Sequence, residues 1–231
     1  MARKADLRLQ RAGTVINLTS KQQETALGKA VKKVVVRLQL EFADIQLHHK
    51  QSWPLVEIVD QLKHDFPDVP FAEPPERRWL EPDGGVLSII DRNDKHHVIL
   101  ISEVKNQGTN DQRKAEGKKR QAQGNAIERL GKNVIGFRAA MLTEGIMPFV
   151  CFGYGCDFAT DSSILDRVVT MAMFGPLNEI ELSNRGQFNR GSFFFREKKW
   201  TQKSMADIMY EVADRSIHYY FSKYGKAAFR Q

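Results

Sequence analysis

Two short apolar runs near the middle of the chain give its clearest pattern. Val86–Ile90 and Val98–Val104 are rich in β-branched residues, and the polar run 91–95 separates them. Two such runs around a short polar break predict a β-hairpin. An acidic residue stands at the outer end of each run, Asp83 before the first strand and Glu103 at the close of the second. Those ends lie side by side in a hairpin, so the two carboxylates can meet.

Apolar positions at helical spacing surround this hairpin. We expect helices over residues 19–40, 54–66, 124–141, 164–173 and 205–221. The short apolar runs 148–152 and 192–195 predict strands, and we expect the phenylalanines of the second to belong to the core rather than to a platform for base stacking. Helices before, between and after strands indicate an α/β fold with a central mixed sheet flanked by helices. We expect residues 21–231 to form one domain, preceded by a basic, mobile arm at residues 1–20.

Composition indicates a globular protein, and the distribution of charge suggests which kind of ligand it binds. The chain has 231 residues, of which 42% are hydrophobic, enough to bury a globular core. Residues 1–40 carry nine basic and two acidic side chains, residues 41–100 carry six and twelve, and residues 101–140 carry nine and four. Acidic charge therefore gathers around the hairpin, with basic charge on both sides of it. This distribution suits a nuclease, which attracts a nucleic-acid backbone and holds a cation locally, although a merely solvated basic surface remains the alternative.

The sequence predicts a cytoplasmic protein with no membrane partner. No apolar run approaches the ~20 residues of a membrane helix, and the N-terminal residues lack a signal-peptide segment. Cys151 and Cys156 lie in an apolar stretch without a cluster of histidines nearby. We expect them to be buried free thiols rather than zinc ligands, as in a reducing compartment.

The end of the hairpin carries the residue types of a metal site. Side chains alternate along a strand, so Glu103 and Lys105 share one face while Val104 points into the core. Two carboxylates beside an ammonium group suit Mg²⁺, which proteins usually hold with one or two carboxylates, water and phosphate oxygens. The tripeptide Glu-x-Lys also occurs at residues 116–118 and 197–199, so a solvated hairpin end remains the alternative.

The segment after the hairpin is basic and leads into a helix. Residues 106–123 are polar and too long for a simple connector, which predicts a DNA-facing loop or arm. Its basic residues include Lys118, Lys119 and Arg120. The N-terminus of the following helix, at Gly124, suits phosphate through free N–H groups and the helix dipole. Asn125 suits pairing with adenine, but from the residues alone an ordinary N-cap is the preferred interpretation.

Several stretches, taken in order, resemble one known family. Pro82-Asp83-Gly84-Gly85 and the run 102–108 resemble the catalytic motifs of the EcoRI group of type II restriction endonucleases, a branch of the PD-(D/E)xK nucleases. Gly-Asn-Ala-Ile-Glu-Arg at residues 124–129, followed by Lys132-Asn133, is similar to the recognition-helix signature of that group. Residues 164–167 and the closing helix also fit, so the resemblance extends over about residues 25–225.

The resemblance implies a Mg²⁺-dependent homodimer that cuts both strands of a palindromic duplex and leaves a 5′-phosphate and a 3′-hydroxyl. Asp83, Glu103 and the carbonyl of Val104 are then expected to bind the metal. Lys105 is expected to orient or help to activate the attacking water. Metal and lysine together would offset the charge of the transition state. A cognate DNA methyltransferase is the expected partner that protects host DNA.

The resemblance also implies how DNA is read. Asn125, Ala126 and Arg129 are expected to read the inner A·T pairs of an AATT core. Glu128 is expected to hold Arg129 in place across the dimer, and Arg167 to support the same network.

Three departures from the family pattern affect these expectations. Gln121, Ala122 and Gln123 stand where the family has Met-Ala-Ala beside the outer base pair. A glutamine donates or accepts, so the outer base pair is open and relaxed purine/pyrimidine reading is a hypothesis. An arginine of the family is Ile164 here, which removes one charged contact. The histidine after the catalytic lysine is Asn106, which puts one phosphate contact in doubt.

The sequence therefore favours a sequence-specific, Mg²⁺-dependent DNA endonuclease. Two alternatives remain: a non-catalytic DNA-binding protein whose carboxylates only cap a hairpin, and a less specific repair nuclease of the same fold. Lys105 argues against the first, because a pure binding protein needs no ammonium group at the end of an acidic hairpin.

Overall fold

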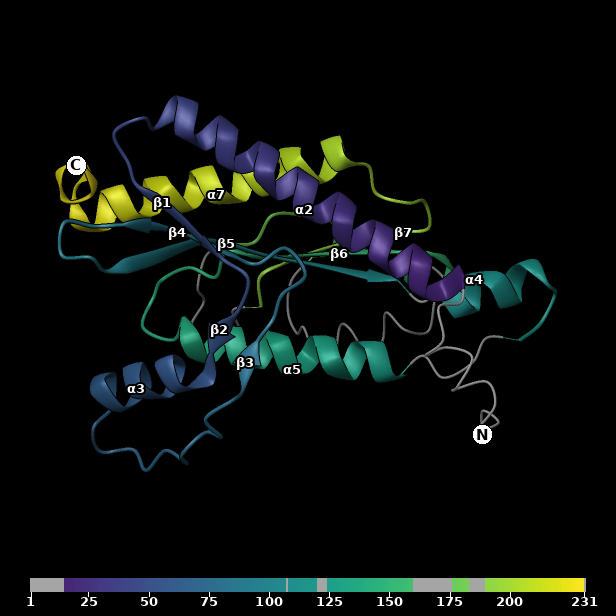
Figure 1. Ribbon diagram of the computed structural model, residues 1–231, viewed down its shortest axis with the longest axis horizontal. Coiled ribbons are helices and arrows are strands. Elements are labelled where there is room, and N and C mark those ends of the chain that lie inside the picture. The colour runs from purple at the N-terminus through teal and green to yellow at the C-terminus, as the bar shows by residue number, and fades with distance from the viewer. Residues whose placement is uncertain (1–14, 107, 120–123, 160–175, 183–189, 231) are drawn as a thin grey trace.

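A mixed β-sheet forms the centre of the molecule in the computed structural model (Figure 1). The structure describes residues 15–106, 108–119, 124–159, 176–182 and 190–230, and it leaves the side chains of residues 15–20, 108–109 and 124–129 undescribed. The sheet has five strands in the order β1-β4-β5-β6-β7. They are β1 (Leu47–Lys50), β4 (Val86–Ile90), β5 (His96–Asn106), β6 (Phe149–Tyr154) and β7 (Ser192–Arg196).

The strand directions make the sheet mixed. Strand β4 runs antiparallel to both of its neighbours, β1 and β5, whereas β5, β6 and β7 run parallel to one another. The carboxyl ends of three parallel strands and the start of β4 therefore meet at one edge. This arrangement confirms the predicted α/β class with a central mixed sheet, and it confirms the hairpin.

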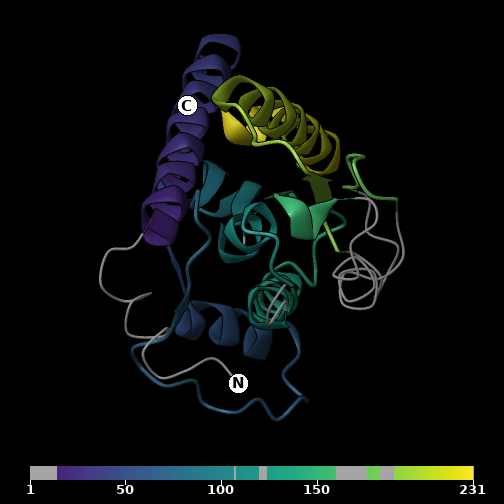
Figure 2. The same ribbon diagram turned by 90° about the vertical axis from the view of Figure 1, so that its right-hand side faces the viewer.

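Helices cover both faces of the sheet, as the turned view makes clear (Figure 2). Helices α2 (Val15–Glu41) and α7 (Gln202–Tyr224) lie on one face, and α3 (Leu55–Asp65) and α5 (Gly124–Ala140) lie on the other. The smaller elements are α4 (Gly108–Ala115), the short strand pair β2 (Trp53–Pro54) and β3 (Trp79–Leu80), and two 3₁₀ turns, η1 (Cys156–Phe158) and η3 (Lys226–Phe229). None of the described helices is long and apolar enough to cross a membrane.

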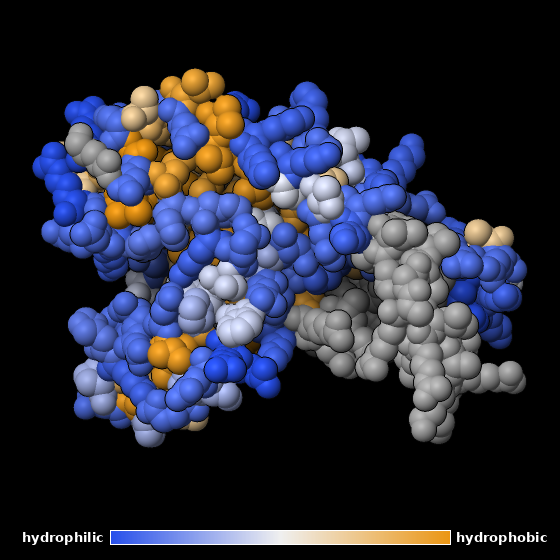
Figure 3. All heavy atoms as spheres, viewed as in Figure 1, coloured by the Kyte–Doolittle hydropathy of each residue, from blue (hydrophilic) through white to orange (hydrophobic). Residues whose placement is uncertain are grey.

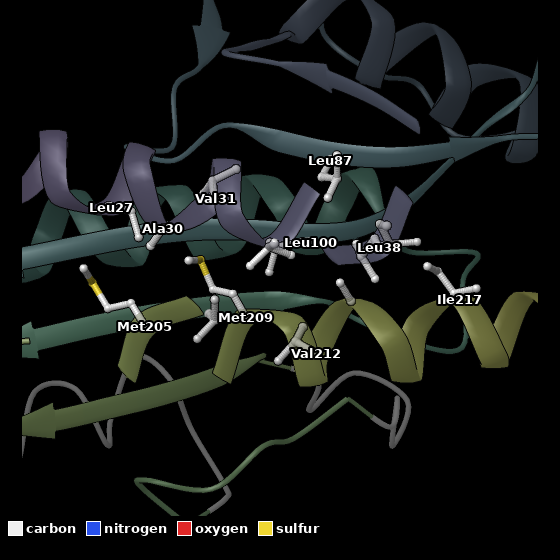
Figure 4. Close-up of a cluster of buried hydrophobic side chains, with 14 of the residues drawn as sticks. Leu27, Ala30, Val31, Leu38, Leu87, Leu100, Met205, Met209, Val212 and Ile217 are labelled. Atoms are coloured by element: carbon white, nitrogen blue, oxygen red, sulfur yellow. The ribbon is translucent and has the colours of Figure 1, made fainter. Parts of the chain in front are cut away.

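The first hydrophobic core lies between α2, α7 and the sheet (Figure 4). Leu27 and Leu38 of α2 are fully buried, and so is Met209 of α7. Leu87 and Leu100 complete this layer from β4 and β5. Full burial of one such side chain contributes about 1.5–3 kcal/mol, so this face fixes the strands that carry the site. The face of the molecule drawn in Figure 3 is largely hydrophilic, with apolar residues gathered over the C-terminal half of α2, where Val36 and Leu40 are exposed.

The second core lies beneath α5. Leu130, Val134 and Phe137 are buried along one side of the helix, as the helical spacing predicted, and Met141 is buried just beyond its end. Ile127 belongs to the same predicted stripe but lies outside the described side chains. The phenylalanines of β7 are buried in the two cores, so their assignment to the core is confirmed. Both cysteines are free and buried, as predicted.

The structure departs from the predicted elements in three places. Helix α2 begins at Val15, so residues 15–20 are helical rather than part of an arm. No glycine or proline interrupts the sequence between Val15 and Gly28, so nothing stops the helix from starting early. Part of the predicted loop 106–123 forms α4, and tertiary contacts hold this helix against the edge of the sheet. Strand β1 was not predicted, because Leu-His-His-Lys has a single apolar residue and its strand depends on pairing with β4.

Candidate active site

The hairpin places Asp83 against the end of β5. Beyond the last residue pair of β4 and β5, the Gly84 N–H still donates to the Ser102 carbonyl at 2.9 Å. At the next step, the Asp83 carboxylate accepts the backbone N–H of Val104 at 3.0 Å. The side-chain oxygen of Asp83 thus takes the place of a backbone carbonyl as the next acceptor in the antiparallel hydrogen-bond pattern between β4 and β5. Asp83 is therefore held at the edge of the sheet, beside the strand that carries Glu103 and Lys105.

The two carboxylates share one ammonium group. The Nζ atom of Lys105 contacts Oε1 of Glu103 and lies 3.4 Å from Oδ2 of Asp83. Val104 points to the opposite face and belongs to the core between α2 and α7. The predicted meeting of the two carboxylates and the predicted alternation of side chains along β5 are both confirmed.

Burial and charge determine the protonation of this cluster. The Glu103 side chain is 1% exposed. Burial raises the pKa of Glu103, and repulsion from Asp83 adds to this effect, although Lys105 opposes it. Burial also lowers the pKa of Lys105, but the carboxylates of Glu103 and Asp83 outweigh burial and raise that pKa above its usual value. The two carboxylates therefore favour the charged form of Lys105.

A third polar group reaches Glu103 from α5. The side-chain amide of Asn133 donates to both carboxylate oxygens of Glu103, at 3.0 and 3.2 Å. From the sequence, Asn133 was only part of a family signature and had no predicted role. A signal was present, because Asn133 is a polar residue directly beside the buried Val134, at the margin of the apolar stripe.

A further acidic residue approaches the site from α2. Burial and repulsion from the Asp83 carboxylate raise the pKa of Glu24, whereas Lys105 lowers it. Glu24 thus adds negative potential near Asp83 and Lys105. Sequence reasoning missed it because α2 and the hairpin are about 60 residues apart in the sequence, and only the packing of Leu27 against Gly84 brings them together.

Asn106 turns away from the acidic cluster. Its amide donates to Oδ2 of Asp111 at 3.2 Å and to the Tyr154 carbonyl at 2.9 Å. Asp111 of α4 in turn accepts the Cys156 N–H at 2.7 Å, beside Gly155, where a Cβ would lie 2.6 Å from the carboxylate. These contacts fasten α4 to the sheet edge. Asn106 is therefore engaged within the protein, in keeping with the doubt about a phosphate contact at this position.

The predicted DNA-binding residues are only partly described. Lys118 and Lys119 follow α4 and are exposed, and Lys118 pairs with Glu116 at 2.6 Å. The backbone of residues 124–129 forms the first turns of α5, so Asn125, Ala126, Glu128 and Arg129 lie at the helix start, but their side chains are outside the description. Arg120, Gln121, Ala122, Gln123 and Arg167 lie outside the described residues.

The donor set is consistent with a hard cation. Within the described ranges, no group of three or more His, Cys, Asp or Glu side chains is arranged to enclose a metal ion. Asp83 and Glu103 converge on one positive charge, the Lys105 ammonium group, so the same oxygens could accept a cation. Mg²⁺ usually needs only one or two protein carboxylates, because water and phosphate oxygens complete its shell. The residues present therefore fit Mg²⁺.

Gly84 allows the close approach that positions Asp83. A Cβ at this position would lie 2.1 Å from Oγ of the buried Ser102 and 3.1 Å from Cδ2 of Leu27. We predict that Gly84→Ala displaces the turn from β5, costs about 1–3 kcal/mol of stability and lowers any cleavage rate about 10²-fold. Thermal unfolding and single-turnover cleavage would measure both effects.

The matched control is Gly28→Ala on α2, where a Cβ meets nothing within 4 Å. Alanine favours a helix over glycine by up to about 1 kcal/mol, so this variant should be unchanged or slightly more stable. If Gly84→Ala behaved like Gly28→Ala, the close packing of the turn would have no role.

Comparisons with known proteins place the chain in a family. The family model described as restriction endonuclease EcoRI matches residues 10–227, a range that includes the hairpin, α5 and α7. The chain is 26% identical over 240 residues to the type II restriction enzyme RsrI of Cereibacter sphaeroides, covering 88% of this chain and 87% of that protein. It is 25% identical over 236 residues to the type II restriction enzyme EcoRI of Escherichia coli, covering 86% and 85%.

Proposed function

Because the chain belongs to the EcoRI family of type II restriction endonucleases, we propose that it cuts both strands of a palindromic DNA site with an AATT core. The chain is a site-specific deoxyribonuclease. The proposal adds Mg²⁺ as the cofactor, and 5′-phosphate and 3′-hydroxyl ends as the products.

One observation carries the catalytic part of the proposal. Asp83, in the turn before β4, and Glu103 of β5 both contact the Nζ atom of Lys105 at one edge of the sheet. This edge also receives Asn133, from the helix that begins with the recognition signature. The Asn133 amide thus connects the proposed DNA-reading helix to Glu103, one of the two proposed catalytic carboxylates.

In the proposed mechanism, Asp83, Glu103 and the Val104 carbonyl would be the protein ligands that hold the cation. Mg²⁺ bound there supplies positive charge that polarises the phosphate and favours ionisation of water. The Lys105 ammonium group donates a hydrogen bond that orients the attacking water, and its charge offsets the negative charge of the transition state. Its raised pKa supports this role, because the group keeps its proton at neutral pH.

DNA recognition is proposed for the start of α5 and the segment before it. Asparagine pairs in bidentate fashion with adenine, and alanine contacts the thymine methyl group. Asn125 and Ala126 would therefore read A·T pairs with Arg129, which Glu128 orients across the dimer and Arg167 supports. Gln121, Ala122 and Gln123 would face the outer base pair, whose identity stays open.

The partners follow from the reaction. Each chain has the pair of converging carboxylates Asp83 and Glu103, and one such pair serves one strand, so symmetric cleavage of two strands calls for two copies. We therefore propose a homodimer whose two-fold axis matches that of the palindrome. A cell that makes such an enzyme has to protect its own sites, for which a methyltransferase of the same specificity is the proposed partner.

The test is digestion of a sequenced plasmid in the presence of Mg²⁺, with mapping of the fragment ends. The proposal predicts discrete fragments whose ends fall at sites with an AATT core. Random degradation would favour a repair nuclease instead. Tight binding with no cleavage under any divalent metal would favour a non-catalytic DNA-binding protein.

The basic residues after α4 give a separate prediction for DNA binding. Lys118 is exposed, and its surface ion pair with Glu116 is worth little, so it is free to exchange Glu116 for a phosphate. Removing one lysine–phosphate interaction lowers the slope of log K against log salt by about 0.9. The double variant Lys118→Ala/Lys119→Ala should therefore reduce the slope by nearly 2, in keeping with about 0.9 for each lysine.

Binding measured without divalent metal at several salt concentrations would give this slope. Lys95→Ala, in the exposed β4–β5 turn at the other end of the hairpin, should leave the slope unchanged. An unchanged slope in the double variant would remove these lysines from the DNA interface.

A further inference from the structure

The hydrogen bonds around Glu103 hold its carboxylate between two elements. Lys105, on the same strand, contacts Oε1, and the Asn133 amide spans Oε1 and Oε2 from α5. The Glu103 side chain is 1% exposed, so water does not take the place of these donors. The orientation of this carboxylate therefore depends on where α5 lies.

Helix α5 packs closely against the sheet. Val134 and Phe137 flank Asn133 on the buried side, at 2% and 0% exposure. At Gly136, a Cβ would lie 2.8 Å from Cδ1 of Leu80, so the helix also packs closely against β3. Elements packed this tightly move together, because the close-packed interior of a protein has few voids into which side chains could shift. Any shift of α5 along the sheet is thereby transmitted to the Asn133 amide.

The same helix carries the recognition signature in its first turns. Asn125 and Asn133 are eight residues apart, which is about 12 Å along a helix. Base contacts made at the helix start and the hydrogen bonds made to Glu103 therefore belong to one rigid element.

We propose that Asn133 is a positioning residue that holds the Glu103 carboxylate in its metal-binding orientation and so ties the recognition helix to the catalytic strand. This inference rests on the proposed function, since it assigns Glu103 to the metal. In this proposal Asn133 acts through Glu103, to which its side-chain amide donates both hydrogen bonds. Partners that orient a metal ligand typically contribute 10- to 100-fold in metal affinity or activity.

The experiment measures single-turnover cleavage of the mapped site as a function of Mg²⁺ concentration. For Asn133→Ala, we expect the half-saturating Mg²⁺ concentration to rise about 10- to 100-fold. The rate at saturating Mg²⁺ should recover to a large extent, and DNA binding without metal should be unchanged. Asn133→Gln keeps an amide donor on a longer side chain, so its half-saturating concentration should lie between those of the wild type and Asn133→Ala.

A merely structural role would give a different pattern. It would lower the rate equally at all Mg²⁺ concentrations, together with the melting temperature, and this result would overturn the inference. Asn93→Ala is the matched control, because Asn93 is exposed in the β4–β5 turn, at the other end of the hairpin, and should not change the Mg²⁺ dependence.

The outcomes separate this inference from the proposed function. If the wild type cuts its site with Mg²⁺ but Asn133→Ala keeps the wild-type Mg²⁺ dependence, only the role of Asn133 is wrong. If the wild type cuts no DNA with Mg²⁺, the proposed function itself is wrong, and the inference falls with it.

Discussion

Asp83→Asn is expected to abolish DNA cleavage and to leave the fold intact. The substitution keeps the shape of the side chain and an oxygen that accepts the Val104 N–H, now seen at 3.0 Å. It removes one of the two negative charges that face Lys105 and the proposed cation. Loss of this charge should lower the cleavage rate by roughly 10³-fold, the upper end of the 10²–10³-fold that removal of a single electrostatic interaction with the transition state costs, because Asp83 is a proposed ligand of the cation.

Three measurements test this prediction: single-turnover cleavage with Mg²⁺, DNA binding without metal, and thermal unfolding. Binding and unfolding should stay close to the wild type. Asp68→Asn is the control, since Asp68 is an exposed acidic residue in the segment between α3 and β3 and should leave cleavage unchanged. Cleavage by Asp83→Asn within about tenfold of the wild type would remove Asp83 from the metal site.

Lys105→Met is expected to produce the largest loss of stability. The substitution leaves Glu103 buried without its cation, and removing one partner of a buried ion pair typically costs about 3–5 kcal/mol. The double variant Lys105→Met/Glu103→Gln also removes the buried charge and should recover most of this loss. Lys63→Met, which breaks an exposed ion pair with Glu73, should change stability by less than about 1 kcal/mol.

The destabilisation should depend on pH in a defined direction. The pKa of Glu103 is already raised by burial, and loss of Lys105 removes the attraction that opposes this shift. A carboxyl group whose pKa is raised on folding stabilises the native state at low pH and loses this contribution as pH rises through the raised value. Urea unfolding at pH 5 and pH 8 should therefore show the larger deficit of Lys105→Met at pH 8. An equal deficit at both values would mean that Glu103 is not the cause.

The sequence predicted the elements whose patterns are local. The hairpin followed from two β-branched runs and a polar break, and α5 followed from the spacing of Leu130, Val134 and Phe137. The proximity of Asp83 and Glu103 was predictable because a hairpin brings its outer ends together whatever the rest of the fold does. This part of the candidate site required no knowledge of packing between distant elements.

The remaining features depend on contacts across the chain. Strand β1 exists because β4 pairs with it, and α4 is held through Asp111 by the backbone of Cys156. Glu24 approaches Asp83 because α2 packs over the hairpin, and Asn133 reaches Glu103 because α5 lies across β5 and β6. Local propensity carries no information about such pairings, since tertiary context overrides it.

The central claim is that Asp83 and Glu103 hold one cation beside Lys105 at the scissile phosphate. A crystal of the wild-type protein with its mapped DNA site, soaked in Mn²⁺, tests this claim most directly through the anomalous signal of manganese. The proposal predicts a peak bound by both carboxylates and next to a phosphate of the site. A peak bound elsewhere in the protein, or none near these two side chains at saturating Mn²⁺, would contradict it.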